Sequence, residues 1–218
     1  MGMGKETKLN IAKRAAREVE KGMVLNLGIG IPSLVPHFLP KDFPVMIQAE
    51  NGILGMGPEP PPGEEEWELC NAAGYPVTEG KGISYFDSAS AFGMIRSGCI
   101  DMTILGSLEV SSSGDLSNWI VPGKTVPGMG GAIELAQKAK KVLVVMSHTD
   151  KYGRPKIVQQ CSLPITAKKC VSRVITDMAV LDITDSGLLL TEVMEPFSVK
   201  DVISCTGAPL LLSPELNV

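Results

Sequence analysis

The sequence predicts an α/β fold with a largely parallel or mixed sheet. Short apolar segments such as Val45 to Ala49 alternate with amphipathic segments of helical length, and glycine-rich turns follow two of the apolar segments directly. The 218 residues, 44% of them hydrophobic and 20% charged, have the composition of an ordinary globular domain. A chain of this length buries about 70% of its unfolded surface in one core. We therefore expect a single domain over residues 1–218.

The N-terminal part begins with a strong helical pattern. Leu9, Ala12 and Val19 recur at helical spacing, with lysine, arginine and glutamate on the opposite face. Pro32 is well placed for the first turn of a second helix. The elements expected before Glu50 are a helix at 7–21, a strand at 23–27, a helix at 32–39 and a strand at 45–49.

Proline and glutamate dominate the next stretch. The tract from Pro58 to Glu66 holds runs of three prolines and three glutamates, and it is too short for a linker between domains. We expect it to be a surface excursion. The elements expected after it are strands at 82–86 and 101–105, helices at 88–96 and 132–140, strands at 141–146, 178–183 and 188–193, and a helix at 199–205.

Composition excludes several classes of function. A net charge of -4 without a basic cluster disfavours nucleic acid and anionic membrane surfaces as partners. Apolar runs of five or six residues are far too short to span a membrane, and residues 1–10 have no signal-peptide core, so a cytoplasmic protein is expected. Five scattered cysteines and two histidines lack metal-ligand spacing, so we expect no metal and reduced, mostly buried cysteines.

The first glycine-rich turn follows the strand at 23–27. Gly28 and Gly30 stand between this strand and the helix that starts at Pro32, as in a turn that cradles a phosphate. The third glycine of a dinucleotide fingerprint is missing, because Ser33 occupies its place. A tight strand-to-helix turn without a ligand explains the pattern equally well.

The loop at Glu50 is more informative. Its carboxylate comes immediately after a buried strand, at the end of the sheet where α/β proteins bind ligands. Asn51 and Gly52 follow. Because Gly52, Gly55 and Gly57 have no side chains, a substrate could approach the backbone closely here. A charge at the border of an apolar strand costs free energy unless it is paired or functional. The alternative is a glutamate that caps a turn or pairs with a lysine.

A third candidate lies before the helix at 132–140. The segment from Gly128 to Ala132 places the backbone N–H groups of Gly130 and Gly131 near a helix start, where they could stabilise an oxyanion or phosphate. A flexible turn is the plain alternative. His148, after the strand at 141–146, is more often a hydrogen-bonded histidine at the edge of a core than a catalytic base.

Together these segments resemble the B, or beta, subunit of family I CoA-transferases of the 3-oxoacid type. The resemblance runs from about Leu9 to Pro214, with the motifs in the family's order. It implies a three-layer α/β/α sandwich with a mostly parallel or mixed central sheet. The motifs that carry it are Asn26 to Ser33, Glu50 to Pro58, Phe92 to Arg96, Asp115 to Trp119, Gly128 to Ala132, Cys161 to Thr166 and Arg173 to Asp177.

The resemblance also implies roles for particular residues. Glu50 corresponds to the family's catalytic glutamate, and Gly131 to a glycine whose N–H helps to form the oxyanion hole. The residues expected to bind substrate or CoA are Asn51, Gly52, Gly28, Gly30, Gly106 and Gly130. Ala49 and Ser147 stand where the family has serine and glutamate, and the tract from Pro58 to Ile83 departs from the acetoacetate-type pattern, so the substrate stays open.

A transferase of this family moves CoA between an acyl-CoA and a carboxylic acid through covalent glutamyl intermediates. The resemblance implies CoA as a co-substrate, no permanently bound cofactor, and a CoA-transferase A, or alpha, subunit as the partner in a hetero-oligomer. A short-chain 3-oxoacid such as acetoacetate is the leading substrate, with succinyl-CoA or acetyl-CoA as donor. Whether the chain alone forms a homodimer stays open.

Three rival functions compete with this one. An acyl-CoA hydrolase would use water to resolve the glutamyl thioester. A sugar-phosphate isomerase would need a basic phosphate clamp, for which only Lys124 lies near the glycine-rich loops in the sequence. A non-catalytic regulatory subunit could keep the fold, although an intact Glu50 among its glycines argues against that reading.

Overall fold

The computed structural model of the chain describes residues 3–123 and 129–216. Its helices are α1 (Lys5–Ala16), the 3₁₀ helix η1 (Pro32–Phe38), α2 (Ser88–Arg96), α3 (Ala132–Lys138) and α4 (Val199–Cys205). Its strands are β1 (Val24–Leu27), β2 (Met46–Ala49), β3 (Ile53–Met56), β4 (Glu79–Tyr85), β5 (Met102–Gly106), β6 (Glu109–Ser111), β7 (Leu116–Ser117), β8 (Lys141–Val145), β9 (Ile157–Val158), β10 (Arg173–Ile175), β11 (Ala179–Thr184), β12 (Gly187–Val193) and β13 (Leu210–Leu212).

Ten of these strands form one mixed sheet in the order β13-β12-β11-β10-β8-β5-β1-β2-β3-β4. The run β10-β8-β5-β1-β2 at its centre is parallel, and β11 and β3 pair antiparallel on either side of it. From β1 the chain goes to β2 on one side, whereas β5 lies on the other side. The carboxyl ends of β1 and β5 therefore flank a topological switch point, where ligands bind in open α/β sheets.

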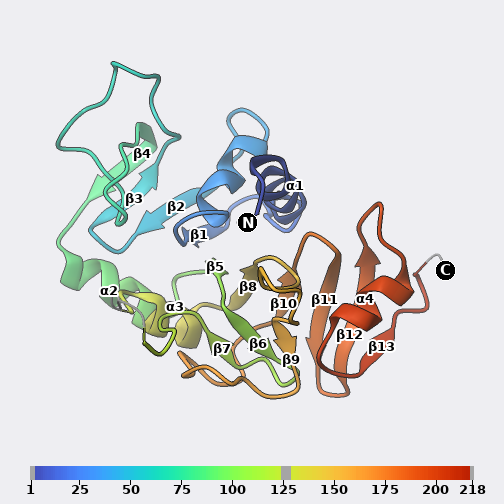
Figure 1. The fold of residues 1–218 in the computed structure, drawn as a ribbon. Coiled ribbons are helices and arrows are strands. Elements are labelled where there is room, and N and C mark those ends of the chain that lie inside the picture. Colours follow the sequence, from blue (N-terminus) through green and yellow to red (C-terminus); the bar gives the residue numbers. More distant parts are fainter. Residues whose placement is uncertain (1–2, 124–128, 217–218) are drawn as a thin grey trace.

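The sheet lies between two cover layers (Figure 1). On one face α1 and η1 pack against Leu25, Ile104 and Leu143. On the other face α3, α4 and a small sheet of order β7-β6-β9 pack against Leu105 and Val144. Because alternate residues of a strand point to opposite faces, the central strands are mostly apolar when both faces are buried. The three-layer α/β/α prediction is confirmed, with the small sheet as an addition to the second cover layer.

Most expected elements are present, with shifted ends. The helices at 88–96 and 199–205 begin and end where the sequence pattern places them. The expected helix at 7–21 begins instead at Lys5 and ends at Ala16. The segment after Pro32 is a 3₁₀ helix, and Pro36 inside it has no N–H to donate to an α-helical bond.

The cysteines correct one expectation. They are free thiols as expected, but none is fully buried: Cys99 is exposed, and the other four are half-buried. Four of the cysteines lie in loops or at an isolated bridge, and Cys205 ends α4; Cys170 and Cys205 pack against the edge of the apolar core. Cys161 and Cys170, for example, contact backbone carbonyls of Asp115 and Gly114.

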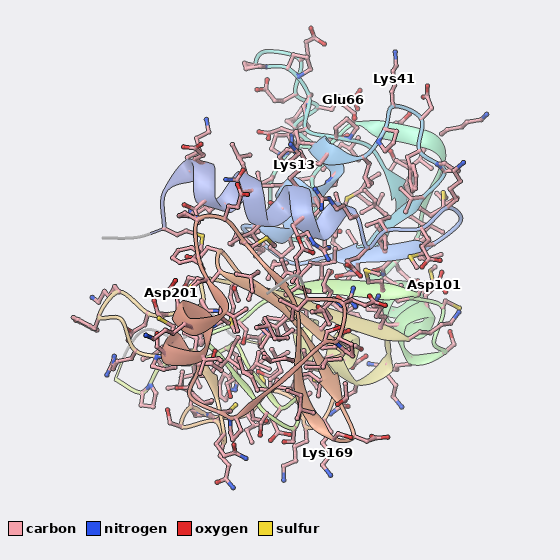
Figure 2. The ribbon with its side chains drawn as sticks, turned by 90° about the vertical axis from the view of Figure 1, so that its right-hand side faces the viewer. Lys13, Lys41, Glu66, Asp101, Lys169 and Asp201 are labelled. Carbon is pink, nitrogen blue, oxygen red and sulfur yellow. The ribbon has the colours of Figure 1, made fainter. Side chains whose placement is uncertain are left out.

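Charged side chains are distributed over the whole surface. Figure 2 shows Lys41 and Glu66 near the top of the molecule and Lys169 at the bottom, and all three are exposed. None of the helices among residues 3–123 and 129–216 combines the length and the apolar composition that crossing a bilayer requires.

Candidate active site

The Glu50 side chain stands in a tight turn between β2 and β3. Ala49 O accepts a hydrogen bond from Gly52 N at 3.1 Å, and Gly52 O accepts one from Phe86 N at 3.0 Å. Gly52 has a φ of 119°, and a Cβ atom at this position would lie 1.9 Å from Phe86 O. Glycine is therefore required where the turn crosses the end of β4, and this crossing holds Glu50 at the carboxyl end of β2.

Two buried amides position the Glu50 carboxylate. Asn26 Nδ2 on β1 donates to Glu50 Oε2 at 3.2 Å and to Gln48 Oε1 at 2.7 Å. The parallel register pairs Asn26 directly with Gln48 on β2, and Gln48 Nε2 donates to Ala91 O at 3.4 Å. Asn26 is the first residue of one of the motifs that carry the family resemblance, but the sequence analysis assigns no role to Asn26 or to Gln48. The available signal was a polar residue in the middle of each of two otherwise apolar strands.

Gly131 lies against the same carboxylate. It precedes α3, and a Cβ atom added to it would lie 3.2 Å from Glu50 Oε1 and 3.4 Å from Glu50 Cδ. A side chain at position 131 would therefore press on the Glu50 carboxylate, and glycine leaves that space open. The two strongest candidates from the sequence, which come from distant segments, meet at one point.

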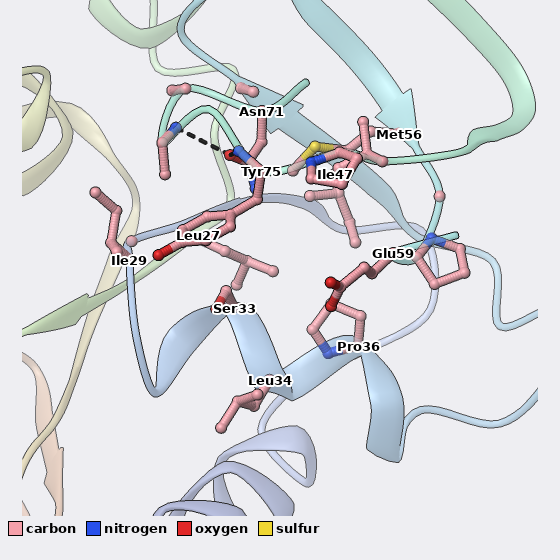
Figure 3. A pocket seen from close by; sticks show the side chains of 18 of the residues that line it. Leu27, Ile29, Ser33, Leu34, Pro36, Ile47, Met56, Glu59, Asn71 and Tyr75 are labelled. Carbon is pink, nitrogen blue, oxygen red and sulfur yellow. Dashed lines mark hydrogen bonds between the residues drawn. The ribbon is translucent and has the colours of Figure 1, made fainter. Parts of the chain in front are cut away.

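A cavity of about 290 Å³ opens beside Glu50 (Figure 3). Its walls come from the turn after β1, from η1, from the ends of β2 and β3, and from residues 57–78 between β3 and β4. This segment contains the expected excursion, and the name is used for all of it from here on. The residues that line the cavity are Leu27, Gly28, Ile29, Gly30, Ser33, Leu34, Pro36, His37, Ile47, Ala49, Glu50, Met56, Gly57, Pro58, Glu59, Asn71, Ala72, Ala73, Tyr75, Pro76 and Val77. The excursion is largely exposed, as expected, but it also closes one side of this cavity.

The other expected binding residues divide into two groups. Gly28 and Gly30 line the cavity. Asn51 instead donates from Nδ2 to Cys70 O at 2.8 Å and fastens the excursion to the Glu50 turn. Gly106 ends β5 and accepts a hydrogen bond from Asn118, and Gly130 precedes Gly131 with a φ of 53°. Neither of these two glycines lines the cavity, nor does Gly52.

His148 is a fully buried, hydrogen-bonded histidine. Its Nδ1 lies 2.9 Å from Thr176 Oγ1 and its Nε2 lies 2.9 Å from Thr206 Oγ1. Burial lowers the pKa of His148 to about 4, against a weaker opposing effect of the Asp177 charge. The ring is neutral near pH 7 and has no contact with the Glu50 cavity, in agreement with the structural interpretation from the sequence.

Within the described part of the chain, no group of three or more histidine, cysteine, aspartate or glutamate side chains could hold a metal ion. Lys124, the one basic residue considered for a phosphate clamp, and Gly128, the first residue of the glycine motif, lie outside the described residues.

The family model described as coenzyme A transferase matches residues 8–204. A protein of Bacillus subtilis (strain 168), named as the beta subunit of a probable coenzyme A transferase, is 59% identical over 210 residues, or 96% of this chain and 97% of the relative. The B subunit of succinyl-CoA:3-ketoacid coenzyme A transferase from Helicobacter pylori (strain ATCC 700392 / 26695) is 46% identical over 91% of this chain and 95% of its own.

A solved structure shows the same fold. The apoenzyme of an acyl-CoA transferase from Escherichia coli O157:H7 matches with a TM-score of 0.79 and 22% sequence identity. The match covers 99% of this chain but only 44% of that longer chain.

Proposed function

This chain belongs to the coenzyme A transferase family, and we propose that it is the family's catalytic-glutamate subunit, with Glu50 as the nucleophile. The observation that supports this most directly is the convergence on one carboxylate. Glu50 lines a cavity, accepts a hydrogen bond from Asn26, and has the backbone of Gly131 against its other oxygen. A carboxylate held between strands and open to a cavity can attack an acyl carbon.

The proposed reaction has two halves. A Glu50 oxygen attacks the carbonyl carbon of the donor acyl-CoA, forming an acyl-glutamyl anhydride and releasing the CoA thiolate. The thiolate attacks the glutamyl carbonyl, which releases the donor acid and leaves a glutamyl-CoA thioester. The acceptor carboxylate then attacks this thioester and expels the thiolate, which attacks the acceptor's acyl carbon. The new acyl-CoA leaves and the Glu50 carboxylate is regenerated.

The neighbours of Glu50 have distinct tasks in this scheme. Each tetrahedral intermediate carries a negative oxygen, which the Gly131 N–H stabilises. Asn26 holds one oxygen of the glutamate, so that the other faces the incoming carbonyl. Because every nucleophile arrives as a carboxylate or a thiolate, no general base is needed, consistent with a buried, neutral His148.

The names of the relatives support a proposal for the substrates and the partner. Two relatives at 46–47% identity are named as B subunits of succinyl-CoA:3-ketoacid coenzyme A transferases, one of them as a probable one. We propose that this chain likewise works with an alpha subunit, that CoA is its co-substrate, and that one substrate is a short-chain carboxylic acid, with a 3-oxoacid such as acetoacetate as the leading candidate.

Trapping of the covalent intermediate tests the nucleophile. The complex of this chain with its alpha subunit is treated with acyl-CoA in the absence of acceptor, reduced with borohydride, and digested for mass spectrometry. The expected result is a reduced side chain at Glu50 that appears only after acyl-CoA treatment. An unmodified Glu50 in a complex that binds CoA contradicts the proposal.

Product analysis separates the transferase from the hydrolase. With an acceptor acid present, a transferase produces the acceptor's CoA thioester and little free CoA. A hydrolase releases free CoA at the same rate with and without the acceptor.

A further inference from the structure

The cavity beside Glu50 contains a second carboxylate. Glu59 lines it from the excursion, and Figure 3 shows its carboxylate directed toward Pro36. No lysine or arginine is among the described residues that line the cavity, and His37 is the one basic side chain there. The remaining polar groups are neutral, and include the Tyr75 hydroxyl and the Asn71 amide.

The backbone before Glu59 is firmly held. Gly57 N donates to Thr78 O at 2.6 Å, and Pro58 O accepts hydrogen bonds from Thr78 N at 2.9 Å and from Thr78 Oγ1 at 2.8 Å. A side chain at Gly57 would collide with Thr78 Oγ1, since its Cβ would lie 2.5 Å away. The excursion therefore presents Glu59 to the cavity from a fixed strand-like pair.

Within the described structure, the Glu59 carboxylate has neither a hydrogen bond nor an ion pair to a protein group. Of the polar neighbours in the cavity, Ser33 Oγ already donates its hydrogen to Gly30 O at 2.8 Å. The cavity walls also include the apolar side chains of Leu27 and Ile47. The Glu59 side chain is exposed to solvent, but a cleft lined by charge of one sign and by low-dielectric walls focuses the field of that charge on a ligand.

We infer that this cavity selects a short acyl group bearing an ammonium at the end distant from its carboxyl, and that Glu59 is the specificity-determining residue. The inference rests on the proposed function, in which the reacting carbonyl lies at Glu50. An acid with an ammonium at its far end places that cation in a cavity whose unpaired charge is negative. An acid with a second carboxylate places like charges together. Of the two expected donors, acetyl-CoA suits this cavity and succinyl-CoA does not.

Three four-carbon acids test the inference as acceptors: butanoate, 4-aminobutanoate and succinate. The purified complex with the alpha subunit receives acetyl-CoA as donor, and kcat/KM is measured for each acid. We expect the value for 4-aminobutanoate to exceed that for succinate about tenfold or more, the size of one favourable charge pair. Glu59→Gln is expected to lower the ratio of 4-aminobutanoate to butanoate about tenfold and to leave butanoate itself within about twofold.

Glu68→Gln is the matched control. Glu68 is an exposed glutamate of the same excursion that does not line the cavity, so its variant removes the same charge and is expected to keep all three ratios. Equal or better use of succinate by the wild type, or an unchanged ratio in Glu59→Gln, overturns the inference.

Failure of the proposed function gives a different result. In that case no acid of any charge accepts CoA, and the cavity is tested by binding alone. 4-Aminobutanoate is titrated calorimetrically into the wild-type and Glu59→Gln complexes. About tenfold weaker binding to the variant supports the cation-selecting cavity. Equal binding, or no binding to either complex, overturns it.

Discussion

At the residue scale, the contact between Gly131 and Glu50 makes a direct prediction. Gly131→Ala puts a methyl group 3.2 Å from Glu50 Oε1, closer than carbon and oxygen normally pack. The carboxylate must then shift by a few tenths of an ångström, away from the N–H that we propose to stabilise the oxyanion. We expect kcat to fall about 10²- to 10³-fold, the usual effect of losing one oxyanion donor. Steady-state kinetics of the complex with the alpha subunit measures it.

Gly93→Ala is the control for this substitution. Gly93 lies inside α2, and a Cβ atom there meets nothing within 4 Å. Alanine is also the better helix former by about 1 kcal/mol, so this variant should be fully active and slightly more stable. Equal activity of both alanine variants would refute a role for the Gly131 backbone.

His148 predicts how stability depends on pH. Its pKa of about 4 in the folded chain lies below 6.5, so between these values the unfolded chain binds a proton that the folded chain does not. Stability should therefore be complete above pH 6.5 and decline as the pH falls toward 4, by about 3 kcal/mol from this residue. Urea unfolding at several pH values measures the decline.

The two histidines separate this effect from the titration of carboxylates. His148→Gln loses hydrogen bonds and should be less stable at pH 7, but its decline between pH 6.5 and 4 should be shallower. His37 is exposed, so His37→Gln should keep the wild-type slope. An identical slope in all three proteins would rule out a neutral His148.

The sequence singles out Glu50 and Gly131, which the structure brings together, because each interrupts a local pattern: a charge after an apolar strand, and glycines before a helix. It could not predict the supporting amides of Asn26 and Gln48. Their pairing depends on the register of β1 with β2, which is set by the packing of the whole sheet.

At the element scale, a charged cluster fixes α1 to the sheet. Glu18, immediately after α1, accepts hydrogen bonds from Arg14 at 2.8 Å and from Arg173 of β10 at 2.6 and 2.7 Å. Burial by itself would raise the pKa of Glu18, but the hydrogen bonds from the two arginines lower it to about 2. Arg173 also pairs with Asp182 of β11. The cluster therefore joins the first helix to the C-terminal half of the sheet.

Glu18→Gln should destabilise the fold by about 3 kcal/mol, because it leaves two arginines with part of their charge uncompensated in a largely buried site. Glu20→Gln removes the same charge from an exposed position two residues away and should change stability by less than about 0.5 kcal/mol. Urea unfolding at pH 7 compares them. Similar midpoints for the two variants would show that the cluster contributes nothing.

Which elements the sequence could predict also has a physical reason. Long amphipathic segments and apolar runs of five residues carry a clear period, and most of the helices and strands that they predict are present in the structure. The strands without an expectation, such as β7 and β9 with two residues each and β10 with three, are too short to show any period. Only their partners define them as strands.

At the scale of the whole molecule, the cavity is a product of tertiary structure that the sequence did not predict. The proline- and glutamate-rich composition of the excursion predicts only that it lies on the surface. Its return over the Glu50 strand depends on separate contacts, including Asn51 with Cys70 and Thr78 with Pro58. Such contacts join residues about twenty positions apart and leave no local pattern.

The excursion also bears on assembly with the alpha subunit. Its Trp67 side chain is 88% exposed, and Ile29 at the cavity wall is 67% exposed. Trp67 belongs to the part of the molecule around β3 and β4, which extends from one side of the sheet (Figure 1). Ile29 lines the cavity, and Trp67 lies in the segment between β3 and β4 that forms part of the cavity wall. We expect these exposed apolar side chains to contact another protein. We therefore expect the alpha subunit to cover the excursion and to complete the CoA site.

The purified chain alone should bind CoA poorly and transfer it at background rates, and an equimolar amount of the alpha subunit should restore activity. Hydrogen exchange should show protection of residues 58–78 upon mixing. Trp67→Ala should raise the concentration of the alpha subunit needed for half-maximal activity about tenfold or more, since a buried tryptophan is a typical interface anchor. Leu212→Ala, an exposed apolar residue on β13 at the opposite edge of the sheet, should not change it. Ordinary transfer rates from the chain alone would show instead that its site is complete without a partner.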